Sequence, residues 1–206
     1  RAGSWQRAVE GLRHLVALRA TALDVVTCAF PENLGELDEL KSILEAIGVS
    51  RWRIFPIFPK GRAREDEALL FDPSGFRGLM DWIAARRTGG GLRPEFCCEG
   101  YLPPAVDRAV REEPYFCRAG ICIASVLHDG AISACPNIDR ALVQGNVRED
   151  DLMTVWEHHF APFRDRSWLR TGECAVCRDW ARCRGNSLHL YDPDLGGPVR
   201  CHRKEL

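Results

Sequence analysis

Apolar positions in the first half of the chain alternate between a helical and a strand-like period. Ser4 can cap an opening helix, whose apolar residues recur three and four positions apart: Trp5, Ala8, Val9, Leu12, Leu15 and Val16. The β-branched run at 24–30 then predicts a buried strand, in which Cys28 is expected to be a small core residue. A second helix is predicted from Asn33, with Glu36 as its capping-box partner, and Gly48 ends it.

The same alternation continues to residue 97. Residues 52–58 and 92–97 predict strands, and residues 74–87 predict a helix with one apolar face. Strands and helices joined by short loops predict a parallel sheet with helices outside it, in a partial β/α barrel or an open α/β sheet. Three strands cannot close a barrel and would have an exposed edge, so we expect this chain to be the C-terminal part of a longer protein.

A different pattern begins after residue 116. The apolar runs at 120–127 and 131–134 predict a hairpin, because Gly130 between them can supply a positive φ. Cys117 and Cys122 precede or enter its first strand, and Cys135 follows its second. A hairpin brings its two ends together, so these three thiols can converge on one point. A short helix predicted at 150–159 is expected to be structural.

Charge and composition narrow the functional classes. The 206 residues include 28 basic and 29 acidic ones without a long run of one sign, which argues against nucleic acid and anionic membrane surfaces as partners. The sequence also has no apolar run long enough to span a membrane and no N-terminal signal-peptide pattern. With 46% hydrophobic residues the chain can bury a core, and we expect a cytoplasmic protein.

The cysteines gather in the second half. Of ten, only Cys28 lies in the first 96 residues. Cys174, Cys177 and Cys183 lie within ten residues, and Cys201 completes a set of four thiols suited to a tetrahedral ion or a cubane cluster. A secreted disulfide scaffold is disfavoured, because such proteins are small and lack a preceding α/β segment. We therefore expect an α/β domain at 1–96, a linker at 97–116, and a small Cys-rich α+β domain at 117–206.

These residues carry a family resemblance. Twelve residues separate Cys117 from Gly130, and four separate Gly130 from Cys135. Cys174-x2-Cys177-x5-Cys183 and Cys201 follow. This spacing resembles the SPASM domain, the auxiliary-cluster module of radical SAM enzymes. The preceding half resembles, less specifically, the later β/α units of the radical SAM partial barrel. The resemblance implies two auxiliary [4Fe–4S] clusters, with these ligands: Cys117, Cys122 and Cys135 for the first, and Cys174, Cys177, Cys183 and Cys201 for the second. It also implies that Ile57 and Phe58 contact the adenine of S-adenosylmethionine (SAM).

The sequence departs from the family pattern in two places. The pattern has a fourth cysteine for the first cluster four residues after Cys183, where this chain has Ser187. Serine is a poor substitute for a thiolate, so the first cluster has an open iron, takes another ligand such as His189 or Cys98, or is absent. The Cys-x3-Cys-x2-Cys motif, which holds the SAM-cleaving cluster in the family, does not occur here. This chain by itself is therefore not expected to generate a radical.

Two functions remain open from the sequence. The resemblance implies an intact enzyme that cleaves SAM reductively, with electrons from a donor such as flavodoxin or ferredoxin, and abstracts hydrogen from a peptide or protein substrate. Alternatively, the thiols hold zinc and the Cys-rich domain is a peptide-binding module without radical chemistry. Four thiolates suit zinc as well as an iron-sulfur cluster, so the ligands alone do not choose between them.

Overall fold

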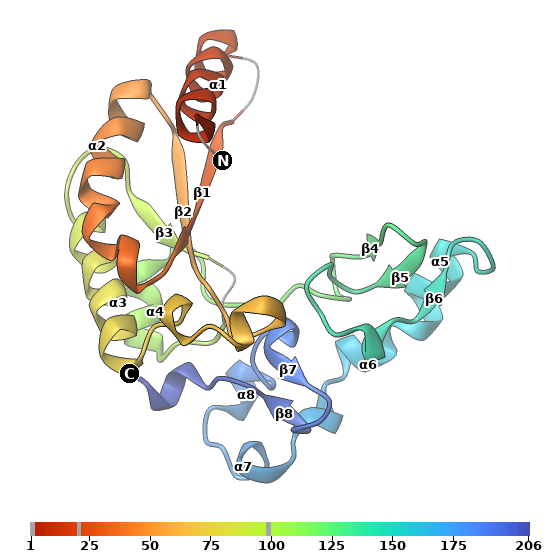
Figure 1. Ribbon diagram of the computed structural model, residues 1–206. Helices are drawn as coiled ribbons and strands as arrows, with labels where there is room; N and C mark the ends of the chain where they lie inside the picture. Colours follow the sequence, from red (N-terminus) through yellow and green to blue (C-terminus); the bar gives the residue numbers. More distant parts are fainter. Residues whose placement is uncertain (1–2, 20–21, 98–99) are drawn as a thin grey trace. The chain divides into compact units, whose positions relative to one another are not determined.

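The computed structural model describes residues 3–19, 22–97 and 100–206, and the chain divides into two compact units (Figure 1). Unit 1 comprises Arg1–Glu99, Pro103–Pro114 and Glu205–Leu206. Unit 2 comprises Gly100–Leu102 and Tyr115–Lys204. Within the described residues, the helices are too short or too polar to cross a membrane.

Unit 1 is built on a parallel sheet in the order β1-β2-β3. Its strands are β1 (Asp24–Ala29), β2 (Arg51–Pro56) and β3 (Pro94–Phe96). Its α-helices are α1 (Ser4–Leu18), α2 (Leu37–Ile47), α3 (Pro73–Arg87) and α4 (Pro104–Val110). Short 3₁₀ helices occur at Pro31–Glu36, Gly61–Arg64 and Glu67–Leu69. The parallel pairing predicted from the strand–helix alternation is confirmed.

The core of unit 1 lies between α3 and one face of this sheet. Alternate β2 residues, Trp52 and Ile54, are fully buried, as is Phe96 of β3. The predicted apolar face of α3 is also buried, and its Phe76 ring packs edge-to-face against Phe96 with ring centroids 6.0 Å apart. Buried residues therefore recur at every second position along the strands and about every 3.6 positions along the helix, and both sets of side chains pack into one core.

The pattern of buried and exposed residues along β1 changes the interpretation of Cys28. β1 is an edge strand, and its residues alternate between exposed and partly buried positions, with Cys28 exposed. The prediction of Cys28 as a buried core residue is therefore wrong. The β-branched run predicted a strand buried on both faces, whereas only one face of β1 takes part in the core.

Two predicted helix starts also differ. Gly3, with φ 73°, is the N-cap of α1, and Ser4 is its first helical residue without a side-chain capping bond. The Asn33 side chain accepts a hydrogen bond from the Phe30 amide at 2.9 Å, inside the 3₁₀ turn that precedes α2. α2 itself begins at Leu37 and ends, as predicted, at Gly48 with φ 89°.

Unit 2 begins with the predicted hairpin. Its antiparallel strands are β4 (Ser125–Val126), β5 (Ala131–Ser133) and β6 (Gly145–Asn146), and a second ribbon pairs β7 (Tyr191–Asp192) with β8 (Gly197–Pro198). Gly130 turns the hairpin with φ 86°, as expected. The first strand is shorter than predicted, because the amides of Ile121 and Cys122 both donate to the Arg118 carbonyl and form a turn.

Short helices complete unit 2. The α-helices are α5 (Leu152–Thr154), α6 (Ala161–Arg164), α7 (Gly172–Ala175) and α8 (Trp180–Cys183). A π-helical segment covers Val155–His159, and 3₁₀ turns occur at Arg140–Leu142, Ser167–Leu169, Leu188–Leu190 and His202–Lys204. Ile132, Val155, Phe160, Phe163 and Leu188 form the centre of its hydrophobic core. The core lies beside Cys117 and Cys135, which pack against it.

Candidate metal centre

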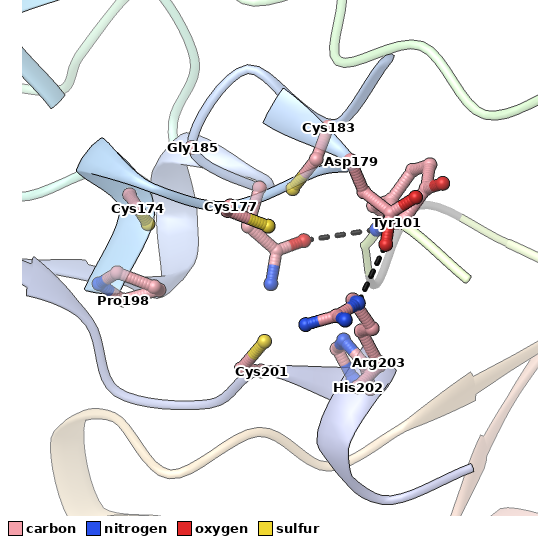
Figure 2. A pocket seen from close by; sticks show the side chains of 11 residues that line it. Tyr101, Cys174, Cys177, Asp179, Cys183, Gly185, Pro198, Cys201, His202 and Arg203 are labelled. Carbon is pink, nitrogen blue, oxygen red and sulfur yellow. Dashed lines mark hydrogen bonds and ion pairs between the residues drawn. The ribbon is translucent and has the colours of Figure 1, made fainter. Parts of the chain in front are cut away.

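Four thiols in unit 2 surround one cavity of about 30 Å³ (Figure 2). We call Cys174, Cys177, Cys183 and Cys201 the cavity group; they come from α7, the turn after it, the end of α8 and the segment after β8. Figure 2 shows the sulfurs of Cys177, Cys183 and Cys201 turned toward a shared space. The structure thus brings together all four members of the set that the sequence analysis identified.

Backbone geometry turns the chain sharply after Cys183. Arg184, Gly185 and Asn186 follow one another with φ values of 51°, 83° and 71°, so three left-handed residues end α8 and reverse the chain. A Cβ on Gly185 would lie 2.7 Å from the Leu169 side chain, so this position requires glycine for space as well as for φ. The tight reversal keeps Cys183 at the cavity while the chain continues into the core.

A buried asparagine joins the segments around the cavity. The Asn186 Oδ1 accepts a hydrogen bond from the Tyr101 amide at 2.9 Å, and its Nδ2 donates to the Arg200 carbonyl at 3.0 Å. Arg200 directly precedes Cys201, so this amide fixes the path of the chain at the fourth thiol. A Cβ on Gly100 would lie 2.4 Å from the Asn186 Oδ1, which shows how closely the segments approach.

The thiols of the cavity group affect one another electrostatically. Burial raises the pKa of Cys183 to about 12, and nearby Cys201 and Cys174 contribute to the increase. Burial also raises the pKa of Cys174, followed by the effects of Cys177 and Cys201. These groups are close enough for each thiolate to disfavour the next, so a bound cation is needed to stabilise several thiolates together.

An ion pair lies on the cavity wall. Arg203 contacts the Asp179 carboxylate, with its Nε 2.5 Å from Oδ2 (Figure 2). Both residues line the cavity together with His202, which is fully buried. The cavity wall therefore combines four thiols with an ion pair and a buried histidine.

The sulfurs surround a space and do not meet at a single point. Within residues 3–19, 22–97 and 100–206, no group of three or more His, Cys, Asp or Glu side chains is arranged to hold one metal ion. This holds for the cavity group and for Cys117, Cys122 and Cys135, which we call the hairpin group.

The hairpin group is less closely gathered than the cavity group. Cys117 and Cys135 are half-buried against the same core, whereas Cys122 is exposed in the turn before β4. Burial raises the pKa of Cys135, and the neighbouring Cys117 adds a smaller effect. Cys117 and Cys135 thus share one environment, and the position of Cys122 on the surface distinguishes it from both.

Ser187, at the expected fourth-ligand position, is buried and hydrogen-bonded. Its Oγ lies 2.9 Å from the Tyr115 hydroxyl. Burial raises the pKa of Tyr115 well above its usual value, with a smaller contribution from Cys117. Of the two substitute ligands considered, His189 is buried in the turn after Ser187, and Cys98 lies outside the described residues.

The residues expected to contact SAM lie in unit 1. Ile57 and Phe58 directly follow β2 and are half-buried, and the Ile57 amide donates to the Ala29 carbonyl at 3.0 Å. Ile57 thus extends the pairing of β2 with β1 by one residue. Nearby on the same strand, Arg53 donates to the Cys97 sulfur at 3.3 Å.

Sequence reasoning missed the polar residues that organise unit 2. Asn186, Tyr115 and Arg166 are distant in sequence from most of their partners, so no local spacing indicated their contacts. The one available signal was Gly185-Asn186, which begins two residues after the predicted ligand Cys183, since both residue types favour the left-handed turn that ends a helix.

Comparison with known proteins shows what the Cys-rich part of the chain is similar to. Residues 117–183 match the model of the SPASM family, an iron-sulfur cluster-binding domain. This part of the chain is similar to the SPASM domain. The match begins at the first cysteine of the hairpin group and ends at Cys183, so Ser187 and Cys201 lie beyond the matched part of the SPASM domain.

Curated proteins match most of this chain in sequence. The chain is 21% identical over 208 residues to an AdoMet-dependent heme synthase of Nitratidesulfovibrio vulgaris, covering 92% of this chain and 55% of the relative. A synthase of the same name from Methanosarcina barkeri is 19% identical, with 92% and 57% covered. The chain thus spans about half the length of the curated relatives it matches.

A solved structure has a similar fold. Streptococcus suis SuiB bound to S-adenosylmethionine gives a TM-score of 0.58 at 14% identity, over 87% of this chain and 44% of SuiB. The resemblance to a radical SAM enzyme with a SPASM domain is confirmed. The mixed α/β architecture agrees with this neighbour.

Proposed function

We propose that this chain is the auxiliary-cluster portion of a radical SAM enzyme, and that the cavity group ligates a [4Fe–4S] cluster. The observation that carries the proposal is the meeting of four thiols around one cavity, in a domain that matches an iron-sulfur module. The donor set fits the group, because four cysteine thiolates are the usual ligands of such a cluster.

The arrangement of the cavity group favours a cluster over zinc. Four thiolates bound to one zinc ion lie about 3.8 Å apart, because each Zn–S bond is about 2.3 Å and the angles are tetrahedral. In a cubane cluster each thiolate binds a different iron, so the sulfurs lie further apart around a larger body. These four thiols share one cavity, and three of them lie in the stretch that matches an iron-sulfur cluster-binding family, so we favour the cluster.

Protein groups around the cavity would hold and tune the cluster, which when bound supplies a one-electron centre. Partial burial of Cys183 limits the access of water, and the Asn186 hydrogen bonds hold the backbone that carries Cys201 in place. Arg203, paired with Asp179, is positioned to offset negative charge at the wall. Burial and nearby charges are established determinants of cluster potential.

The wider roles of the longer protein are part of the same proposal. β1–β3 would be later units of a partial β/α barrel, as the fold similarity to SuiB supports, and Ile57 and Phe58 would contact the adenine of SAM. Electrons would come from a donor such as flavodoxin or ferredoxin. SAM cleavage requires a further cluster, for which the longer protein would supply the ligands.

Two substrate classes follow from different observations. The names of the curated relatives favour a heme-related tetrapyrrole. The resemblance to enzymes with SPASM domains favours a peptide or protein. Equilibrium binding of an iron porphyrin and of a peptide library to the full-length protein separates the two, because specific, saturable binding of one class alone identifies the substrate.

Metal analysis tests the cluster directly. After anaerobic purification we expect visible iron-sulfur absorption and about four irons and four sulfides bound by the cavity group. Cys183→Ser should remove this iron, whereas the matched control Cys28→Ser, which changes an exposed thiol in unit 1, should retain it. A colourless protein with stoichiometric zinc would overturn the iron-sulfur proposal.

A further inference from the structure

The two cysteine groups of unit 2 differ in how their chain segments are joined. The cavity group surrounds a cavity, and its thiols affect one another's pKa. In the hairpin group, Cys117 and Cys135 pack against the same hydrophobic core, but Cys122 is exposed to solvent. A three-thiol cluster at this group would need Cys122 to leave the surface and a fourth ligand to replace the missing cysteine.

A hydrogen bond already occupies the place of that fourth ligand. Ser187 is 1% exposed, and its Oγ and the Tyr115 hydroxyl share a hydrogen bond of 2.9 Å across 72 residues of sequence. Tyr115 lies two residues before Cys117, so this bond joins the same two chain segments that a cluster held by Cys117 and residue 187 would join. To bind iron, Ser187 would have to lose this partner as well as its hydroxyl proton.

A buried arginine makes a second connection between these segments. Arg166 is 4% exposed and donates to the Cys117 carbonyl at 3.1 Å and the Ala119 carbonyl at 3.3 Å. It also donates to the Asn186 carbonyl at 3.5 Å and the Phe163 carbonyl at 3.0 Å. One guanidinium therefore holds the start of the hairpin segment against the turn that leads from Cys183 to Ser187.

We propose that the domain holds a single iron-sulfur cluster, at the cavity group, and that Tyr115, Ser187 and Arg166 replace a second cluster as the cross-link of the hairpin group. This inference rests on the proposed function, since it takes the cavity group as the cluster site. Hydrogen bonds suffice here because they connect segments that are already packed on one hydrophobic core. Cys117 and Cys135 then serve as half-buried packing residues.

Iron counting and ligand substitution test the inference. In the 206-residue chain, which has no Cys-x3-Cys-x2-Cys motif, we expect about four irons for the wild type and the same number in Cys117→Ser and Cys135→Ser. Cys183→Ser should lose all bound iron, and Cys28→Ser is the control for removal of a thiol. About eight irons in the wild type, or a loss of iron in Cys117→Ser, would overturn the single-cluster proposal. A wild-type chain without iron would instead overturn the proposed function.

A second measurement tests the hydrogen-bonded cross-link independently of iron stoichiometry. In Tyr115→Phe we expect unchanged iron content and several-fold faster amide hydrogen exchange around residues 115–119 and 186–190. Exchange in the β4–β5 hairpin should stay at the wild-type rate and provides an internal reference. Loss of iron in Tyr115→Phe, or unchanged exchange at both segments, contradicts the proposed role of the Tyr115–Ser187 bond.

Discussion

At the scale of single residues, Asn186 connects the segments that form the cavity. It is 3% exposed, has a left-handed backbone, and uses both ends of its amide for hydrogen bonds to main-chain groups. Each partner is a buried backbone group that has no access to water if the amide is removed. We therefore expect the Asn186 side chain to contribute to the stability of the cavity region, although it is not one of the four thiols.

Two substitutions of Asn186 distinguish the contribution of its hydrogen bonds to stability from the contribution of its backbone conformation. Asn186→Gly keeps the left-handed conformation and loses both hydrogen bonds, so we expect it to lower the unfolding free energy by about 2–4 kcal/mol. Asn186→Ala adds backbone strain of about 1 kcal/mol. Urea denaturation of both variants measures the two effects. Equal stability of the wild type and the glycine variant would show that the hydrogen bonds contribute nothing.

At the scale of elements, glycines in left-handed turns differ in what surrounds them. Gly185 ends the reversal after α8 against Leu169, whereas Gly196, with φ 61°, lies in an exposed turn between β7 and β8, where an added Cβ would meet no atom within 4 Å. Both need a positive φ, but only Gly185 also needs the space. Packing therefore makes one turn far less tolerant of substitution than the other.

Alanine substitution at the two glycines tests this difference. Gly196→Ala should lower the free energy of unfolding by about 1–2 kcal/mol, the usual strain of a left-handed alanine. Gly185→Ala should cost more, because a Cβ there would lie 2.7–2.9 Å from Leu169 side-chain atoms. Thermal unfolding of the two variants under the same conditions provides the comparison. An equal loss of stability in the two variants would mean that the Leu169 side chain moves aside without an energetic penalty.

The hairpin turn carries a pH-dependent ion pair. Arg140 lowers the pKa of Asp129 to about 2, and a hydrogen bond from the Ala131 amide adds to the shift. The unfolded carboxyl has a pKa of about 3.9. Because the folded pKa is the lower one, the pair stabilises the hairpin above about pH 4, and this contribution is lost as the pH falls from about 4 to 2.

Removal of the cation should abolish this pH dependence. At pH 7 we expect Arg140→Gln to be slightly less stable than the wild type, and the difference to disappear near pH 2. Arg148→Gln, which removes an exposed arginine after β6, controls for the change in net charge. Nuclear magnetic resonance titration of the Asp129 carboxyl provides the direct measurement. A midpoint near 3.9 in the wild type would rule out the pair in solution.

At the scale of the whole molecule, the two units depend differently on metal. Unit 1 has a continuous apolar core between its sheet and α3, whereas the region from α7 to Cys201 consists of short helices and turns around the cavity. α7 and α8 contain no buried residue, so metal binding contributes directly to the folding of this part of the cavity region. The hairpin and Leu188 instead belong to the hydrophobic core of unit 2.

Removal of the metal should therefore loosen one region selectively. After anaerobic chelation we expect amide exchange to accelerate at residues 172–184, while β1–β3 and the β4–β5 hairpin keep their protection. Cys177→Ala should reproduce this pattern without chelation. Uniform loss of protection across both units would show that the metal supports the entire chain. Unchanged protection at 172–184 would show that the cavity region folds without it.

The sequence by itself determined the parallel strands and helices of unit 1, the hairpin around Gly130 and the four cysteines that meet at the cavity. Those features follow from local periodicity, turn chemistry and ligand spacing, which act over a few residues. Only the tertiary structure decided that Cys28 is exposed, that Cys122 is exposed whereas Cys117 and Cys135 are half-buried, and that Tyr115, Arg166 and Asn186 connect distant segments. Burial and long-range hydrogen bonds depend on which segments pack together, and spacing along the chain does not encode that packing.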